Sequence, residues 1–101
     1  MSAIHANVPT SAASRYLQQL CKHWSHKFVV TFTPSHGEIV LQLGRCVLDA
    51  DSVKLSVSLY PEAGTDVQRF KEVVQEHIVR FAFRETLHFD WQDGERGTRT
   101  S

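Results

Sequence analysis

The sequence is poor in cysteine and has no excess of charge, and these two shortages exclude several classes of protein. Cys21 and Cys46 are its only two cysteines, too few for a disulfide framework. Lysine and arginine together number 11, as do aspartate and glutamate, so the net charge is zero before the six histidines are counted. Proteins that bind nucleic acid or anionic membranes usually carry a basic excess. We therefore expect neither nucleic acid nor a membrane among its partners.

Long hydrophobic runs and a targeting segment are missing as well. The apolar runs are too short to span a bilayer, and residues 1–10 lack the basic start and apolar stretch of a signal peptide. Both cysteines lie within apolar patterns, where a free thiol packs like a small hydrophobic side chain. We expect a cytoplasmic protein whose two cysteines are reduced, buried and not bonded to each other.

What the sequence does contain is enough apolar residues for one core, 42% of 101 residues. Helical spacing predicts a first helix over residues 11–26 and a second that starts at a capping box, Thr65-Asp66-Val67-Gln68. Period-two alternation predicts the strands. They fall within residues 3–8, 28–33, 39–43, 46–50, 53–59 and 87–91.

This order, (β)-α-β-β-β-β-α-β, has short links between its central strands, which favour antiparallel pairing. We expect an α+β fold: a two-layer sandwich in which an antiparallel sheet of four to six strands carries two helices on one face. A single domain over residues 1–91 and a disordered tail over residues 92–101 complete the prediction. The order of the strands stays open, and Gly44-Arg45 is either a turn or a bulge.

The two faces of this sheet should differ. We expect one face to be covered by two apolar helix stripes, which comprise Leu17, Leu20, Cys21, Trp24, Phe70, Val74, Ile78 and Phe81. The other face should be mostly polar, with three valines, Val29, Val40 and Val47. Apolar residues grouped on an exposed face often mark a contact surface. One hypothesis is therefore a structural module that forms a homodimer through this open face.

Histidines near the end of the first helix invite comparison with a metal site. Cys21 and His23 lie about 200° apart on a helix, so they cannot bind one ion, whereas His23 and His26 lie about 60° apart. A zinc ion needs four ligands, so His77, His36 or His88 would have to approach. The alternative is that His23 and His77 form only local hydrogen bonds.

A second cluster lies on the second helix, where His77, Arg80 and Arg84 step by three and four residues along one ridge. Arginine offers a two-pronged donor to a carboxylate or phosphate. The blander alternative is that these arginines form ion pairs with Glu76, Glu85 or acidic residues of the sheet, which contribute little. Motifs of known enzymes, such as GxSxG, a P-loop or HExxH, are absent, so an enzyme is the less favoured interpretation and no cofactor is indicated.

Three segments stand out together: Ser14-Arg15-Tyr16-Leu17, the run from Leu20 to Lys27, and the run from His77 to Glu85 with Trp91. They resemble a bacterial family of unknown function, domain of unknown function 2218. The likeness extends from about Ala6 to Trp91. Members of the family occur alone and as an appendage on siderophore-interacting flavin reductases, so the resemblance implies a link to iron or siderophore metabolism. The flavin- and nicotinamide-binding parts of those reductases have no counterpart here, so it implies no reductase activity.

We therefore favour a small binding or accessory module for an anionic or metal-containing ligand, or for a protein partner. Its predicted ligand-binding residues are His23, His26, Lys27, His77, Arg80 and Arg84. The alternatives are a small metal protein or enzyme that uses His23, His26 and His77, and the homodimer through the open face. The spatial relation of His23 to His77 decides most between these hypotheses.

Overall fold

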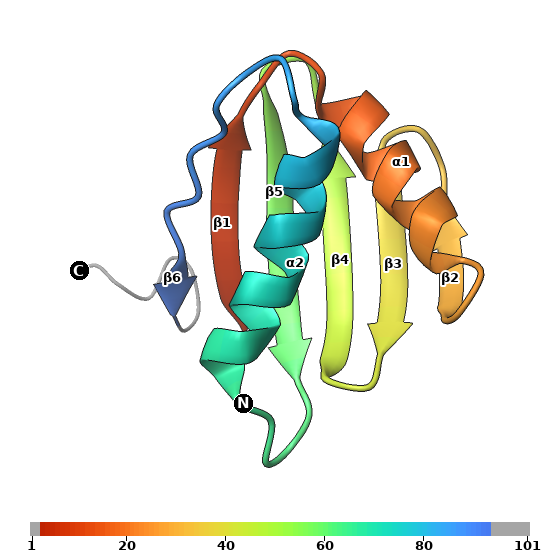
Figure 1. The fold of residues 1–101 in the computed structure, drawn as a ribbon, viewed down its shortest axis with the longest axis vertical. Helices are drawn as coiled ribbons and strands as arrows, with labels where there is room; N and C mark the ends of the chain where they lie inside the picture. Colours follow the sequence, from red (N-terminus) through yellow and green to blue (C-terminus); the bar gives the residue numbers. More distant parts are fainter. Residues whose placement is uncertain (1–2, 94–101) are drawn as a thin grey trace.

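The computed structural model describes residues 3–93 and confirms the predicted sandwich, with both helices on one face of the sheet (Figure 1). Its elements are, in chain order, β1 (Ile4–Pro9), α1 (Ala13–Trp24), β2 (Val29–Phe32), β3 (His36–Leu41), β4 (Gly44–Ala50), β5 (Lys54–Pro61), α2 (Val67–Phe81) and β6 (Gln92–Asp93). Within residues 3–93, neither helix is long and apolar enough to cross a membrane.

The sheet contains six strands in the order β2-β3-β4-β5-β1-β6, and every neighbouring pair is antiparallel. Strands β2 to β5 follow one another as a meander, because each connection is short. Strand β1, although first in the chain, lies between β5 and β6 (Figure 1). The sequence did not predict this order.

The core lies between the sheet and the helices, as the apolar stripes predicted. Alternate residues of β5, Leu55, Val57 and Leu59, are fully buried. Seven of the eight predicted stripe residues are also buried; Phe81 is the exception. Phe81 is the last residue of α2 and only partly buried, with its ring edge-on to His23 at 6.0 Å between centroids. The prediction that Phe81 belongs to the fully buried stripe is wrong, because its ring packs only against the edge of the core, beside the exposed His23.

The first turn of α2 differs from the predicted capping box. Asp66, not Thr65, is the N-cap, and its carboxylate accepts a hydrogen bond from the Arg69 amide at 3.2 Å. The Thr65 hydroxyl instead donates to the Leu43 carbonyl at 2.9 Å. An aspartate is as good an N-cap as threonine, so a tertiary bond to the β3–β4 turn is compatible with a well-capped helix.

The open question at Gly44 is settled in favour of a turn. Gln42 and Leu43 form it, two residues earlier than predicted, so Gly44 and Arg45 belong to β4 and Leu41 pairs with Gly44 across the hairpin. Gly44 has a φ of 148°, and a Cβ atom there would lie 2.4 Å from the Tyr60 carbonyl oxygen. Only glycine fits this position.

The predicted strand over residues 87–91 is wrong. Leu87, Phe89 and Trp91 alternate in sequence because every second side chain packs partly against the core, yet their backbone forms no ladder. The Phe89 and Trp91 rings stack at 5.9 Å between centroids. The strand that does form, β6, pairs with β1 at Gln92 and Asp93, so these two residues do not belong to a disordered tail. Residues 94–101 of the predicted tail lie outside the described residues.

Both cysteines are free and buried, as expected. Burial raises the pKa of Cys21 to about 11 and raises that of Cys46 further, with the nearby Cys21 as the second cause. Cys21 marks the close approach of α1 to β3, because a Cβ atom on Gly37 would lie 2.7 Å from its sulfur.

The open face of the sheet is mostly polar. His36 lies between two carboxylates, with Nδ1 2.6 Å from Asp49 Oδ1 and Nε2 3.2 Å from Glu38 Oε2. Val29 and Val40 are neighbours across β2 and β3 and are 71% and 51% exposed. The homodimer through this face stays a prediction, which light scattering of the purified protein tests.

Candidate ligand-binding pocket between the helices

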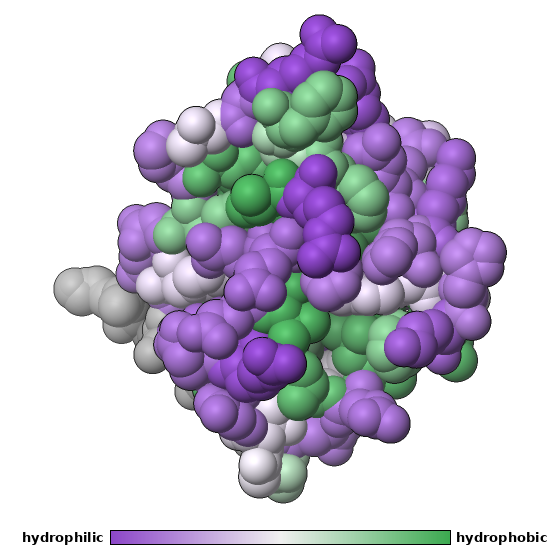
Figure 2. Space-filling view, viewed as in Figure 1, coloured by the Kyte–Doolittle hydropathy of each residue, from purple (hydrophilic) through white to green (hydrophobic). Residues whose placement is uncertain are grey.

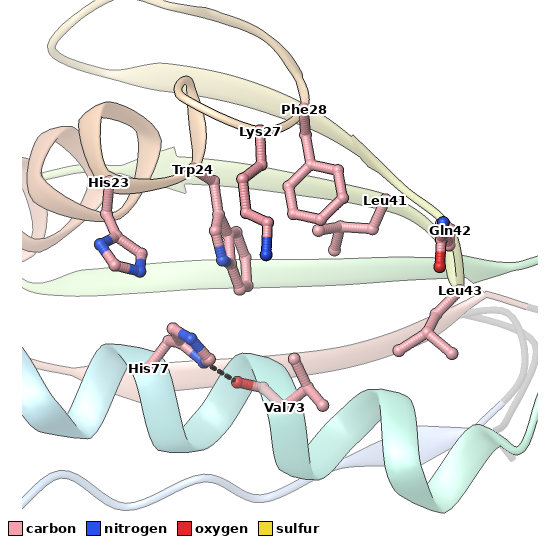
Figure 3. Close-up of a pocket in the computed structure, with 9 residues that line it drawn as sticks. All are labelled: His23, Trp24, Lys27, Phe28, Leu41, Gln42, Leu43, Val73 and His77. Carbon is pink, nitrogen blue, oxygen red and sulfur yellow. Dashed lines mark hydrogen bonds between the residues drawn. The ribbon is translucent and has the colours of Figure 1, made fainter.

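A pocket of about 280 Å³ opens between the end of α1, the flank of α2 and the β3–β4 turn (Figure 3). The side that carries both helices shows patches of apolar surface among its polar side chains (Figure 2). The pocket is lined by His23, Trp24, Lys27, Phe28, Leu41, Gln42, Leu43, Val73 and His77.

Local backbone bonds hold both sides of this pocket in place. The amides of Lys27 and Phe28 both donate to the Trp24 carbonyl, at 3.0 and 2.9 Å, and so fold the chain tightly after α1. The Leu43 carbonyl in the β3–β4 turn accepts from the Glu62 amide at 3.0 Å and from the Thr65 hydroxyl at 2.9 Å. The pocket is therefore formed by anchored backbone.

His23 and His77 face each other across the gap between the helices, with ring centroids 5.5 Å apart (Figure 3). His77 also lies against the indole of Trp24, at 4.8 Å between centroids. The Nδ1 atom of His77 is 2.7 Å from the Val73 carbonyl oxygen, which can only accept. Neutral His77 therefore carries its proton on Nδ1, and its Nε2 atom is left with a lone pair.

The electrostatic surroundings of His23 are basic. Partial burial lowers the pKa of His23, and the positive charges of His77, Arg80, His26 and Lys27 lower it further. The Lys27 ammonium points into the gap between the helices (Figure 3) and has no ion pair with any residue of the described chain. The pocket therefore holds uncompensated positive charge.

The two tryptophans differ in how their indole N–H groups are used. Trp91 donates to the Gln75 side-chain oxygen at 2.9 Å. Trp24 is only 4% exposed, yet within residues 3–93 no atom accepts a hydrogen bond from its N–H. A buried indole N–H usually has a partner, so this donor is available to a molecule in the pocket.

Comparison with known proteins supplies the family. The family model described as "uncharacterized protein conserved in bacteria", domain of unknown function 2218, matches residues 5–92. The chain belongs to this family. Among solved structures, it is similar to the NMR structure of PA4090 from Pseudomonas aeruginosa, with 34% sequence identity and a TM-score of 0.76 over 95% of this chain and 100% of that one. A search of curated proteins found no significant match.

The fold brings together the two segments on which the family resemblance was strongest. The run from Leu20 to Lys27 supplies three of the lining residues, His23, Trp24 and Lys27, and the run that begins at His77 supplies His77 on the opposite side. The segments that carry the family resemblance therefore contribute pocket residues from both helices.

Three of the six predicted ligand-binding residues, His23, Lys27 and His77, line the pocket, and three do not. Arg80 and His26 act on His23 only through their charge, while the Arg84 guanidinium lies over the Phe83 ring at 5.4 Å. The alternative that these arginines pair with Glu76 or Glu85 is not seen among residues 3–93. The carboxylate of Glu85 instead accepts hydrogen bonds from the hydroxyls of Thr10 and Tyr16.

Sequence reasoning missed the apolar wall of the pocket. Trp24 was assigned to the core and Phe28 to a strand, and nothing singled out Gln42, Leu43 or Val73. The position of Trp24 beside His23, in the segment shared with the family, was the one available signal. The wall contributed by the β3–β4 turn depends on tertiary packing alone.

A metal centre finds little support in the geometry. Among the residues that the structure describes, no three or more histidine, cysteine, aspartate or glutamate side chains are grouped so that they could hold an ion. His23 and His77 supply two imidazoles, whereas zinc sites use at least three protein ligands.

Proposed function

We propose that the protein is a non-enzymatic binding module that takes a small anionic ligand in the pocket between α1 and α2. The observation that supports this most is the Lys27 ammonium, which has no ion pair within residues 3–93 and lies in the same pocket as His23 and His77. Lys27 is exposed, so water solvates its ammonium in the free protein, and an anionic ligand would replace that water with a charge-assisted hydrogen bond.

The link to iron or siderophore metabolism that the family resemblance implies is part of this proposal, because ferric chelates of carboxylates and phenolates are anions. The same proposal places the protein in the reducing cytoplasm, which its two free cysteines support.

Binding is tested by NMR on the full chain, with the His23 and His77 ring resonances followed during titration with inorganic phosphate, acetate, benzoate, ferric citrate and zinc. An anion should bind more tightly as pH falls, because protonation of His23 adds positive charge. A metal ion should show the opposite trend, because its imidazole ligands must lose their protons.

Lys27→Met should weaken anion binding about tenfold or more, the range of one charge-assisted hydrogen bond. Lys22→Met is the matched control, because Lys22 is exposed on α1 and does not line the pocket. If no anion shifts the two ring resonances, or if both variants bind equally well, the proposed function is wrong.

A further inference from the structure

We infer that the ligand is an aromatic carboxylate with a single ring. This inference rests on the proposed function and adds the chemical class of the anion.

The walls of the pocket divide into an apolar part and a donor part. Five of the nine lining residues are apolar: Trp24, Phe28, Leu41, Leu43 and Val73. The donors, the Lys27 ammonium and the Trp24 indole N–H, lie in the gap between the helices (Figure 3). A hydrated inorganic anion would bring charged oxygens against leucine and phenylalanine side chains, where nothing replaces the lost water. A ligand with an apolar body and one charged end fits both parts.

The Trp24 N–H and the Lys27 ammonium indicate which charged group the ligand carries. The Trp24 N–H can only donate, and so can the Lys27 ammonium. Their natural partner is a group that only accepts, and an ionised carboxylate has two oxygens that can take one bond each. The buried N–H without a protein partner is the stronger observation, because a charged lysine can be solvated at the pocket mouth whereas a residue only 4% exposed has little access to water.

The aromatic walls specify the apolar body. Trp24 and Phe28 meet at 6.3 Å between centroids and 86°, an edge-to-face pair that makes this wall of the pocket aromatic. His77 adds a third ring at 4.8 Å from Trp24. A volume of about 280 Å³ lies at the lower end of the range for small-molecule pockets, which suits one ring and excludes a dinucleotide or a haem.

The two tryptophans make a direct test available. In a Trp91→Phe variant, Trp24 is the sole tryptophan and its fluorescence reports on the pocket alone. This variant is titrated with benzoate, with acetate as the carboxylate that lacks a ring, with benzamide as the ring that lacks a charge, and with inorganic phosphate. We expect benzoate to change the emission and to bind at least about tenfold more tightly than each of the other three, because each lacks one of the two recognised parts.

Equal binding of benzoate, acetate and phosphate would overturn the aromatic class and leave the anion site standing. Binding of benzamide as tight as that of benzoate would overturn the carboxylate, and with it the proposed anion site. If none of these probes nor ferric citrate binds, both proposals fail.

Variants separate recognition from packing. Trp24→Phe keeps a ring in the wall but removes the N–H, and it should weaken benzoate binding about tenfold, as measured by calorimetry, with little effect on benzamide. Lys27→Met, at an exposed position, should weaken benzoate binding without loss of stability and so covers the case in which Trp24→Phe does not fold. Unchanged benzoate affinity in Lys27→Met overturns the assignment.

Discussion

His36 and His23 lie on opposite sides of the sheet, in opposite electrostatic surroundings. On the open face, Asp49 and Glu38 hydrogen-bond to His36 and raise its pKa. On the helix-covered side, burial and four basic neighbours lower the pKa of His23. The surroundings of His36 leave no ring nitrogen for a ligand, because each of its two nitrogens has a carboxylate partner. The surroundings of His23 have donors and positive charge, but no carboxylate lines the pocket and none of the described residues forms an ion pair there, so a ligand is better sought there than on the open face.

The largest expected difference between the two sides is in stability. Phe70 on α2 is fully buried, and Phe70→Ala should lower the free energy of unfolding by about 3–5 kcal/mol. Val40 on the open face is 51% exposed, and Val40→Ala should cost less than about 1 kcal/mol. Urea unfolding of the two variants measures both values. Similar losses would mean that the open face is covered in solution, as a dimer would require.

The second expectation is the order of the histidine pKa values in the wild-type protein. An NMR titration should place the pKa of His36 above 6.5 and that of His23 below it. The two residues then affect stability in opposite ways. The contribution of His36 is fully present below pH 6.5 and is lost as pH rises through its folded pKa, whereas that of His23 is present above pH 6.5 and is lost as pH falls through its folded pKa. The reverse order of the two values would contradict the comparison.

Asp49→Asn should reduce the difference between the pKa values of His36 and His23 by lowering that of His36. Asparagine keeps the shape but loses the negative charge, and the hydrogen bond that the Asp49 carboxylate accepts from His36 is the largest cause of the raised His36 pKa. That pKa should therefore fall toward its ordinary value, while the His23 resonance serves as an internal control. A His36 pKa that does not move would show that Glu38 alone accounts for the shift.

The smallest effect is expected from Arg80→Gln. Removal of one of the positive neighbours of His23 should raise the His23 pKa slightly. Arg84→Gln is the control, because Arg84 lies over Phe83 and is not among the groups that act on His23. If the two variants shift the His23 pKa equally, general surface charge rather than local geometry sets its value.

Much of the fold was predictable because the burial of side chains is periodic in sequence. The alternation in β5 and the helical spacing of Leu17, Leu20 and Cys21 correspond directly to the core. Prediction failed where side-chain burial alternates but the backbone does not pair with another strand. Leu87, Phe89 and Trp91 alternate like a strand but are packed by ring stacking and a hydrogen bond to Gln75.

For the candidate site, sequence identified the polar residues but not their surroundings. His23, Lys27 and His77 were predicted from residue type and helical spacing, and these line the pocket. Three other predicted residues, Arg80, Arg84 and His26, lie outside the pocket. A helical wheel gives the direction of a side chain around its own helix, but it does not show where the neighbouring helix lies. The roles of Trp24 and Leu43 depend on contacts between segments far apart in the chain, which no local pattern records.

The position of β1 between β5 and β6 has a consequence for how the chain folds. Its partner β5 is made much later in synthesis, and β6 later still, so β1 cannot pair until most of the chain has left the ribosome. The meander from β2 to β5 consists of hairpins between consecutive strands, which cost less loop entropy to close than the pairing of β1 with β5. We expect the meander to form first and β1 to enter as the closing strand, so pulse-labelled hydrogen exchange should protect the amides of β3 and β4 before those of β1.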